Sequence, residues 1–371
     1  MLSLDSEHAC LLELIKAALF DCSPNFPSEV NWDLVFEYAK AQCVVPLVIS
    51  SVPAEYRNSW VNIAYLSKAH YMKMLYEQNM LIELFKSNNV PSIIFKGVAA
   101  AIYYPNPALR TYGDIDFYVS EEYFDLARKV LEQNGYTYSS NNERHYVYNK
   151  NGMIFELHNK IGSYNYNDIE KRVLEGFNNS VDYKIGNSSF PGLPTYVNGL
   201  VLLGHIKQHL KDTGIGLRQI IDWMMFVCKE LDDSAWNNHF RKLTCEAGLE
   251  DLAITVTYLC IKWLGLPNRI TWYNSADETV AERLFIRVLD DGNFGRDIAP
   301  YENVKKKIKK EGALSYLQRS GIETWSLAQK YKVFRPFAWL YQICKYACKG
   351  IAGIFTGKKV FRKDKQVWVV K

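Results

Sequence analysis

The 371-residue sequence lacks the features that would place it in a membrane or outside the cell. It contains no run of eighteen uncharged apolar residues, so we expect no membrane-spanning helix. Acidic residues occupy the N-terminal region where a signal peptide carries basic ones, so we expect no secretory signal. None of the eight cysteines forms a Cys-x-x-Cys pair, which disfavours a zinc site and predicts reduced, mostly buried thiols. Together these absences predict a cytoplasmic protein.

The sequence also lacks a strong charge imbalance. Its 44 basic and 40 acidic residues give a net charge of +4, which is too mild to indicate nucleic-acid binding. The basic excess lies near the C-terminus, at 305–310 and 358–371. We interpret 305–310 as a solvated helix face. Residues 334–356 are expected to form a buried terminal helix or, alternatively, to lie on an anionic membrane surface, so 334–371 could provide weak membrane contact.

Hydrophobic residues make up 48% of the chain and charged residues 23%, which is ordinary for a globular protein. Periodicity and turn residues divide the chain into helices at 1–90, an α/β core at 91–190 and a mostly helical region at 191–371. We therefore predict the α+β class. The expected strands are 92–95, 114–119, 136–139, 145–148 and 153–158. The expected C-terminal helices are 196–211, 217–231, 233–246, 249–264, 276–290, 302–318 and 334–356.

Two aspartates mark the segment from Gly113 to Val119. In a strand, side chains alternate between faces, so Asp114 and Asp116 lie side by side on one face. Such a pair is costly unless a cation lies between them, and Mg²⁺ prefers oxygen ligands that it shares with substrate phosphates. Gly113 would let a phosphate or backbone approach closely. A bare Asp-x-Asp is also typical of an exposed edge strand with a solvated face.

The surrounding residues strengthen the functional interpretation. Lys96 and Gly97 end one predicted strand and open a helix, an arrangement that suits phosphate binding. Glu156 on a later strand could be a third carboxylate, or simply an exposed strand residue. His158 shares its strand face and could touch a metal or phosphate, or orient Glu156. Arg110 could stabilise phosphate charge, or be a plain surface arginine.

The order of these motifs resembles the uncharacterised bacterial nucleotidyltransferase family proteins of the DNA polymerase beta-like nucleotidyltransferase superfamily. The matching motifs span about 90–230 and run in the same order as in that group. The wider superfamily places Gly-Ser or Gly-Gly after the first strand, whereas here Val98 follows Gly97, and Lys96 could compensate. The motifs are Phe95-Lys-Gly97, Arg110, Gly113-Asp-Ile-Asp-Phe-Tyr-Val119, Gly135-Tyr136 and Phe155-Glu-Leu-His158.

This resemblance implies a DNA polymerase beta-like core, a small mixed sheet with helices, flanked by helices on both sides. It also implies a Mg²⁺- or Mn²⁺-dependent enzyme that moves a nucleoside monophosphate from an NTP such as ATP to an acceptor hydroxyl and releases pyrophosphate. Asp114, Asp116 and Glu156 would be the catalytic metal ligands. Lys96, Gly97, Arg110, Gly113 and His158 would contact the nucleotide. The acceptor stays open among sugar, small molecule, peptide or protein, and RNA. The alternative is a catalytically degenerate regulatory or interaction protein, as in an antitoxin.

Two helical pairs in the C-terminal region carry weaker signals. His205 and His209 lie four residues apart on one helix face and could line the nucleotide cleft. The favoured explanation of this pair is a polar helix face or interhelix hydrogen bonds. Arg218 and Asp222 have the same spacing, and we expect them to form a structural ion pair. In the alternative interpretation, Asp222 contacts the substrate.

Overall fold

The computed structural model describes residues 4–141, 145–161, 167–212 and 214–293, together with 314–315, 317–318, 332–341 and 343–344. Residues 1–294 form one compact unit and 295–371 another. In the second unit, the described part includes a 3₁₀ helix, Lys332–Phe337. The predictions for 305–310 and for most of 302–318 and 334–371 lie outside the described residues. No described helix has both the length and the apolar character needed to cross a membrane.

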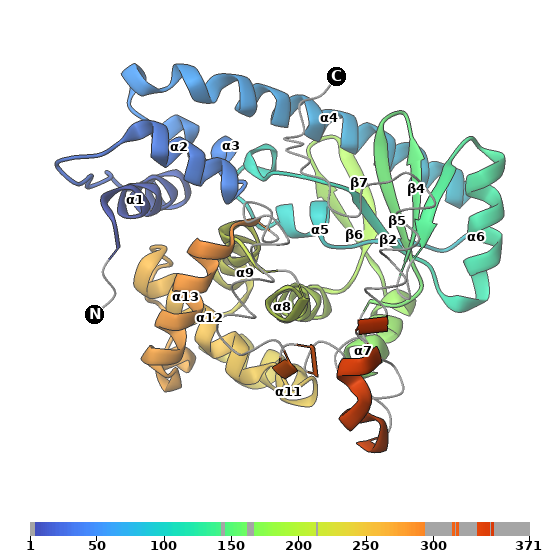
Figure 1. The fold of residues 1–371 in the computed structure, drawn as a ribbon. Helices are drawn as coiled ribbons and strands as arrows, with labels where there is room; N and C mark the ends of the chain where they lie inside the picture. Colours follow the sequence, from blue (N-terminus) through green and yellow to red (C-terminus); the bar gives the residue numbers. More distant parts are fainter. Residues whose placement is uncertain are drawn as a thin grey trace. The chain divides into compact units, whose positions relative to one another are not determined.

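The first unit contains a mixed seven-stranded sheet, which lies on the right in Figure 1, with the strand order β3-β4-β5-β2-β1-β7-β6. β2 runs parallel to β5 and antiparallel to β1, while β3–β4–β5 is an antiparallel meander. The strands are β1 Ile93–Ile94, β2 Ile115–Tyr118, β3 Thr137–Asn141, β4 His145–Lys150, β5 Met153–His158, β6 Val181–Ile185 and β7 Ser188–Gly192.

Thirteen α-helices are described in this unit. The N-terminal ones are α1 Ser6–Phe20, α2 Trp32–Ala41, α3 Val45–Val48 and α4 Asn58–Ser87. Those next to the sheet are α5 Gly97–Ala101, α6 Glu121–Gln133, α7 Asn167–Asn178 and α8 Thr195–Asp212. The remainder are α9 Leu217–Glu230, α10 Asp233–Ala235, α11 Arg241–Glu246, α12 Glu250–Trp263 and α13 Glu278–Asp291. This architecture matches the predicted α+β class.

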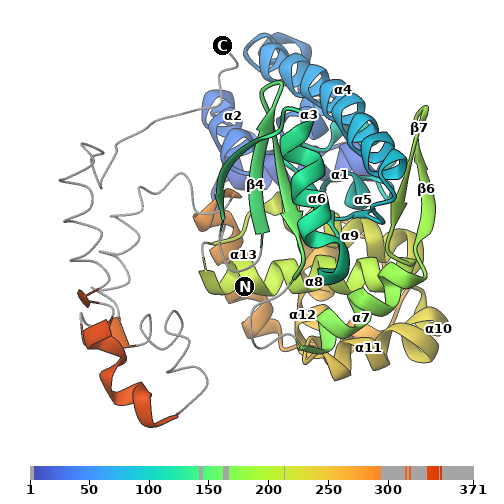
Figure 2. The same cartoon turned by 90° about the vertical axis from the view of Figure 1, so that its right-hand side faces the viewer.

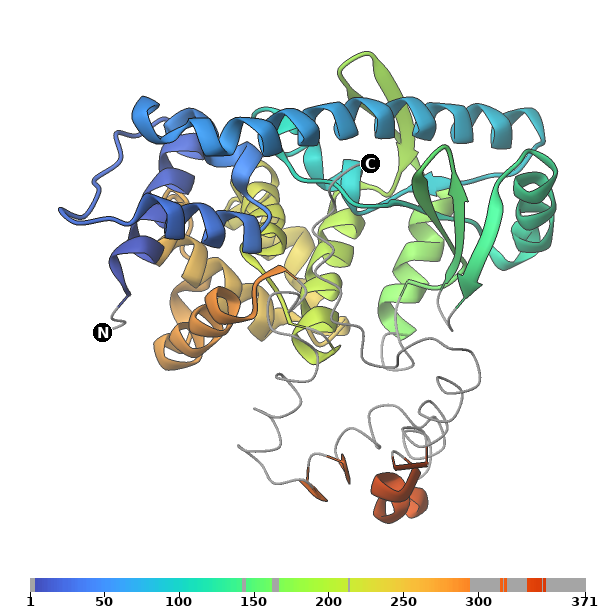
Figure 3. The same cartoon turned by 45° about the horizontal axis from the view of Figure 1, so that its top comes forward.

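The two faces of the sheet belong to different hydrophobic cores. Ile115 and Phe117 of β2 pack with residues of α4 and α6 in one core. Figure 3 shows α4, the long blue helix, running from the N-terminal helices to the sheet. Tyr118 points to the opposite face and packs with residues of α7 and α8 in a second core, to which α1, α9, α12 and α13 also contribute. Asp116 has the same strand parity as Tyr118, so it faces the α7 and α8 side.

Short-range sequence signals explain much of the sheet. Asn151 and Gly152 both have positive φ, 51° and 71°, as a two-residue hairpin turn requires. Gly135 has a φ of 80° just beyond the end of α6, where glycine is favoured. The β6–β7 hairpin was not predicted. It extends the sheet beside α4 (Figure 2), where Asn79 donates to the Ser188 hydroxyl at 2.9 Å.

The cysteine prediction is partly wrong. All seven described cysteines are free thiols, as expected. Only Cys10 and Cys260 are buried, whereas Cys22, Cys228 and others are exposed. The exposure of each cysteine depends on the helix face or loop in which it lies. The irregular spacing of the cysteines along the sequence gives no information on this.

Candidate active site

Parallel pairing of β2 with β5 brings the predicted carboxylates together. Asp116 lies opposite Glu156, and Tyr118 lies opposite His158. On the other side of β5, His145 of β4 lies opposite His158. Because residues in register or two apart share a face, Asp116, Glu156, His158 and His145 form one polar patch on the sheet.

Asp116 is the most constrained member of this patch. Its side chain is 6% exposed, and its Oδ1 lies 2.9 Å from Lys96 Nζ and 3.0 Å from His158 Nε2. Burial opposes ionisation of Asp116, but the charge of Lys96 and the hydrogen bond with His158 prevail and hold its pKa well below the usual range. Asp116 is therefore an ionised, buried carboxylate.

Glu156 also points into the patch. Its Oε2 lies 3.4 Å from the same His158 nitrogen that contacts Asp116, and its Oε1 lies 3.5 Å from His145 Nε2. The side chain is 18% exposed. The simpler interpretation of Glu156, an exposed strand residue, is therefore wrong.

Asp114 immediately precedes β2 and is partly buried. Burial raises its pKa to about 7, and the charges of Asp116 and Glu156 add to that rise, while Lys96 opposes it. The three carboxylates thus influence one another directly. A buried, crowded set of carboxylates is the donor set that a hard divalent cation fits.

The raised pKa of Asp114 predicts a stability change with a definite sign. Its folded-state pKa lies above its unfolded value near 3.8, so stability is highest with the carboxyl protonated and falls as pH rises through 7. We expect Asp114→Asn to raise the free energy of unfolding of the metal-free protein by about 2–4 kcal/mol at pH 8 and by little below pH 4. Urea denaturation across this pH range measures the difference.

Asp182→Asn, at an exposed position on β6, is the matched control and should change little at either pH. Equal unfolding free energies for the wild type and Asp114→Asn at pH 8 would contradict the crowding of the three carboxylates.

Lys96 has an unusual backbone conformation, with φ 54° and ψ −132°. A non-glycine residue held there costs on the order of 1–3 kcal/mol, which the surrounding structure must offset. Its ion pair with Asp116 provides part of that compensation. Asp116 raises the pKa of Lys96 against the opposing effect of burial, so the ammonium stays charged. The ammonium lies within the patch, as the phosphate-contact prediction requires.

Gly97 and Gly113 both leave room for a side-chain carbon. A Cβ on Gly97 would meet only the Asp114 carbonyl oxygen, at an ordinary 3.8 Å, and a Cβ on Gly113 would meet nothing within 4 Å. Neither has a positive φ. Internal packing therefore does not require glycine at either position, and the space beside Gly113 is open.

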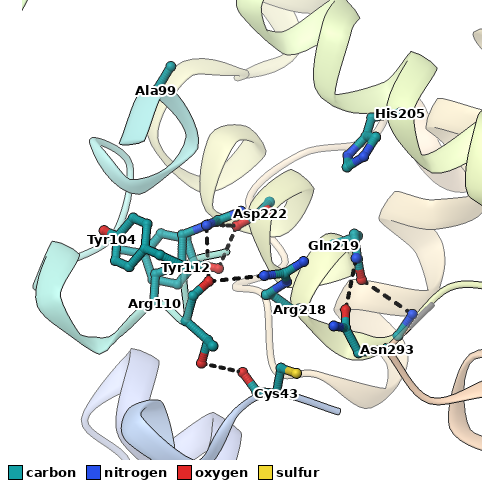
Figure 4. A network of polar contacts seen from close by, with 12 residues as sticks. Cys43, Ala99, Tyr104, Arg110, Tyr112, His205, Arg218, Gln219, Asp222 and Asn293 are labelled. Carbon is teal, nitrogen blue, oxygen red and sulfur yellow. Dashed lines mark hydrogen bonds and ion pairs between the residues drawn. The ribbon is translucent and has the colours of Figure 1, made fainter. Parts of the chain in front are cut away.

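Arg110 is buried in a structural network rather than lying on the surface (Figure 4). Its Nε and Nη2 each donate to Asp222 at 2.7 Å, and Tyr104 donates to the same carboxylate at 2.8 Å. We expected Arg218 as the partner of Asp222, but Arg110 takes that role, and Arg218 donates to the Thr111 carbonyl oxygen at 3.2 Å. This network joins α9 to the segment that precedes Asp114.

Helix α8 borders the same patch. A small pocket there is lined by Lys96, Ile169, Val201, Gly204 and His205, among others. The Nε2 atoms of His205 and His209 lie 2.7 Å apart, so the two rings bond each other along one helix face. Burial holds the pKa of His205 well below its usual range, and His209 and Lys96 add to this effect.

Sequence reasoning missed two histidines. His145 lies beside Glu156 and His158. The turn at 151–152 pairs Lys150 with Met153, and the same register pairs His145 with His158. The sequence therefore contained the signal that places His145 in the patch. His70 of α4 lies 3.2 Å from the Gly113 carbonyl oxygen through its Nε2. No local signal in the sequence links His70 to a residue so far along the chain.

The model of one protein family, described as uncharacterised nucleotidyltransferase, matches residues 28–265. The chain belongs to this family. The match includes every element from α2 to α12, so it extends beyond the motifs at 90–230 in both directions. The mixed sheet with its flanking helices is the nucleotidyltransferase architecture that the sequence predicted. No curated protein matches the chain.

Proposed function

We propose that this nucleotidyltransferase family member uses Mg²⁺ or Mn²⁺ to transfer a nucleoside monophosphate from an NTP to an acceptor hydroxyl. The observation that carries the proposal is the in-register pairing of Asp116 with Glu156, together with the open space at Gly113 and the room for a side-chain carbon at Gly97. Carboxylates and open glycine backbone at one place suit a triphosphate with its cation. A bound divalent cation would neutralise phosphate charge and favour attack at the α-phosphorus.

The chain's own residues bind the cation, contact the phosphates and accept a proton. Asp114 and Asp116 supply carboxylate oxygens to the cation, and the Lys96 ammonium contacts a phosphate oxygen. Glu156 accepts the proton of the acceptor hydroxyl. A bond forms between that oxygen and the α-phosphorus while the bond from the α-phosphorus to the bridging oxygen breaks, and pyrophosphate leaves. His158 lies 3.4 Å from Glu156 and 3.0 Å from Asp116 and orients both carboxylates.

One observation favours the alternative, a catalytically degenerate regulatory or interaction protein. The Lys96 ammonium already neutralises Asp116, and Val98, which is buried, stands where the wider superfamily has a small residue. In that case the ion pair would replace the cation, and the chain would bind no nucleotide. Nucleotide binding therefore separates the two functions.

Transfer itself is tested with α-³²P-labelled NTPs, Mg²⁺ or Mn²⁺, and fractionated cell extract as the source of acceptors. We expect label to move from the NTP to an extract component, with one pyrophosphate released per label transferred. The Asp114→Asn/Asp116→Asn double variant gives the background. Label transfer no greater than that background, with every NTP and fraction, would refute the proposed activity.

Gly97→Ala separates nucleotide binding from folding. An alanine Cβ would make only an ordinary contact with the Asp114 carbonyl oxygen and suits the helical backbone, so we expect unchanged or slightly higher stability, by about 0.4–1 kcal/mol. The added methyl group would occupy the space proposed for a phosphate and weaken NTP binding by about tenfold or more. Calorimetric titration and thermal denaturation measure the two effects, and NTP affinity equal to that of the wild type would exclude Gly97 from the nucleotide site.

A further inference from the structure

Two histidines flank Glu156, although the carboxylate chemistry above needs only one of them. His145 and His158 lie opposite each other on β4 and β5, and Glu156 lies two residues before His158 on the same face. His145 has no role in the nucleotide site proposed above. All three side chains are more than four-fifths buried, and they come from two paired strands, which are rigid elements.

The spacing of their donor atoms matches a metal site. One nitrogen or oxygen from each residue lies within 4.8 Å of the others. Nε2 of His145 is 3.5 Å from Glu156 Oε1, and Nε2 of His158 is 3.4 Å from Glu156 Oε2. Ligands about 2.0–2.1 Å from a tetrahedral ion are separated by about 3.4 Å. Each histidine Nε2 therefore lies at a suitable separation from one Glu156 oxygen, Oε1 for His145 and Oε2 for His158, and side-chain rotation would bring the three residues onto a common ion.

The type of donor decides the type of ion. Mg²⁺ selects oxygen ligands, whereas neutral imidazole suits zinc, copper, iron and nickel ions. We propose that His145, Glu156 and His158 bind a divalent first-row transition metal, with Zn²⁺ or Co²⁺ favoured over Mg²⁺. Three protein ligands leave a coordination position open to water or substrate, as in catalytic metal sites.

The neighbouring contacts are compatible with this ion. His158 Nδ1 lies 3.4 Å from the Lys160 carbonyl oxygen, and a proton on Nδ1 leaves the Nε2 lone pair directed at the metal position. Asp116 does not depend on His158 alone, because Lys96 contacts the same oxygen at 2.9 Å. His158 can therefore exchange its contact with Asp116 for a metal bond without leaving that carboxylate unpaired.

The inference assumes nothing about nucleotide transfer, and its test contains no nucleotide. Metal-free full-length protein is titrated with Co²⁺ and Zn²⁺, by visible spectroscopy and calorimetry. We expect one equivalent of Co²⁺ to give the intense visible bands of a four- or five-coordinate site, and Zn²⁺ but not millimolar Mg²⁺ to abolish them. A weak spectrum typical of octahedral Co²⁺, or displacement of the bound Co²⁺ by Mg²⁺, would overturn the proposal. This test needs only the wild-type protein.

Variants then assign the ligands. His145→Gln and Glu156→Gln should each weaken Co²⁺ binding by about tenfold or more. His8→Gln, on α1 outside the patch, is the matched control and should bind as the wild type does. Circular dichroism establishes that each variant is folded. Wild-type affinity in a folded His145→Gln protein would exclude His145 as a ligand and overturn the site.

Discussion

Asp116→Asn is expected to reduce nucleotidyl transfer by about 10³-fold or more, equivalent to about 4 kcal/mol of transition-state stabilisation. Asparagine keeps the shape of the side chain and removes its negative charge. Asp116 is the buried carboxylate to which Lys96 and His158 both bond, so the proposed cation site depends on it more than on any other residue. The labelled-NTP assay measures the loss.

This substitution also leaves the Lys96 ammonium without its buried counter-charge. Asp116→Asn should therefore destabilise the fold, whereas Asp114→Asn should stabilise it at pH 8, because burial and the neighbouring carboxylates raise the pKa of Asp114. Both variants should lose transfer. The opposite stability changes separate lost chemistry from lost folding, and a folded Asp116→Asn protein that keeps more than about a tenth of wild-type activity would exclude Asp116 from catalysis.

Asp222→Asn is expected to lower the free energy of unfolding by about 3–5 kcal/mol, because it leaves the buried guanidinium of Arg110 without a counter-charge. Tyr104 would lose its charged acceptor in the same network. Urea denaturation at pH 7 measures the change. Transfer should fall as well, since this network supports the segment leading to Asp114.

Two variants control for this effect. Asp251→Asn, in an exposed first turn of α12, should change stability by less than about 0.5 kcal/mol. The double variant Arg110→Met/Asp222→Leu replaces both charges with apolar groups and should recover most of the lost stability. A cost below about 1 kcal/mol for Asp222→Asn would show that Arg110 does not depend on this ion pair.

The sequence predicted the elements whose local patterns are strong. The alternation at 114–119 and the Asn151-Gly152 turn predicted the strands that bring Asp116, Glu156 and His158 together. Strand alternation assigned Asp116 to the face opposite Phe117, as the structure has it. These features depend on residues close together in the chain, which explains why they could be predicted.

Two features were not predicted correctly. The β6–β7 hairpin has only a weak signal in the sequence, and the partner of Asp222 is determined by a long-range contact. Gly186, with a φ of 57°, lies in the two-residue turn of the unpredicted β6–β7 hairpin, and Gly-Asn is a recognised hairpin signal. The partner of Asp222 could not be read from spacing. Arg218 has the helical i, i+4 separation, but the ion pair that forms joins Asp222 to Arg110, 112 residues away.

Calorimetric titration of the full chain with each of the four NTPs, in the presence of Mg²⁺ or Mn²⁺, tests the central claim most directly. The account predicts one binding site for at least one NTP, binding that depends on the divalent cation, and its loss in Asp114→Asn/Asp116→Asn. The absence of heat for all four NTPs with either cation, in protein shown to be folded, would contradict it and favour the degenerate regulatory protein.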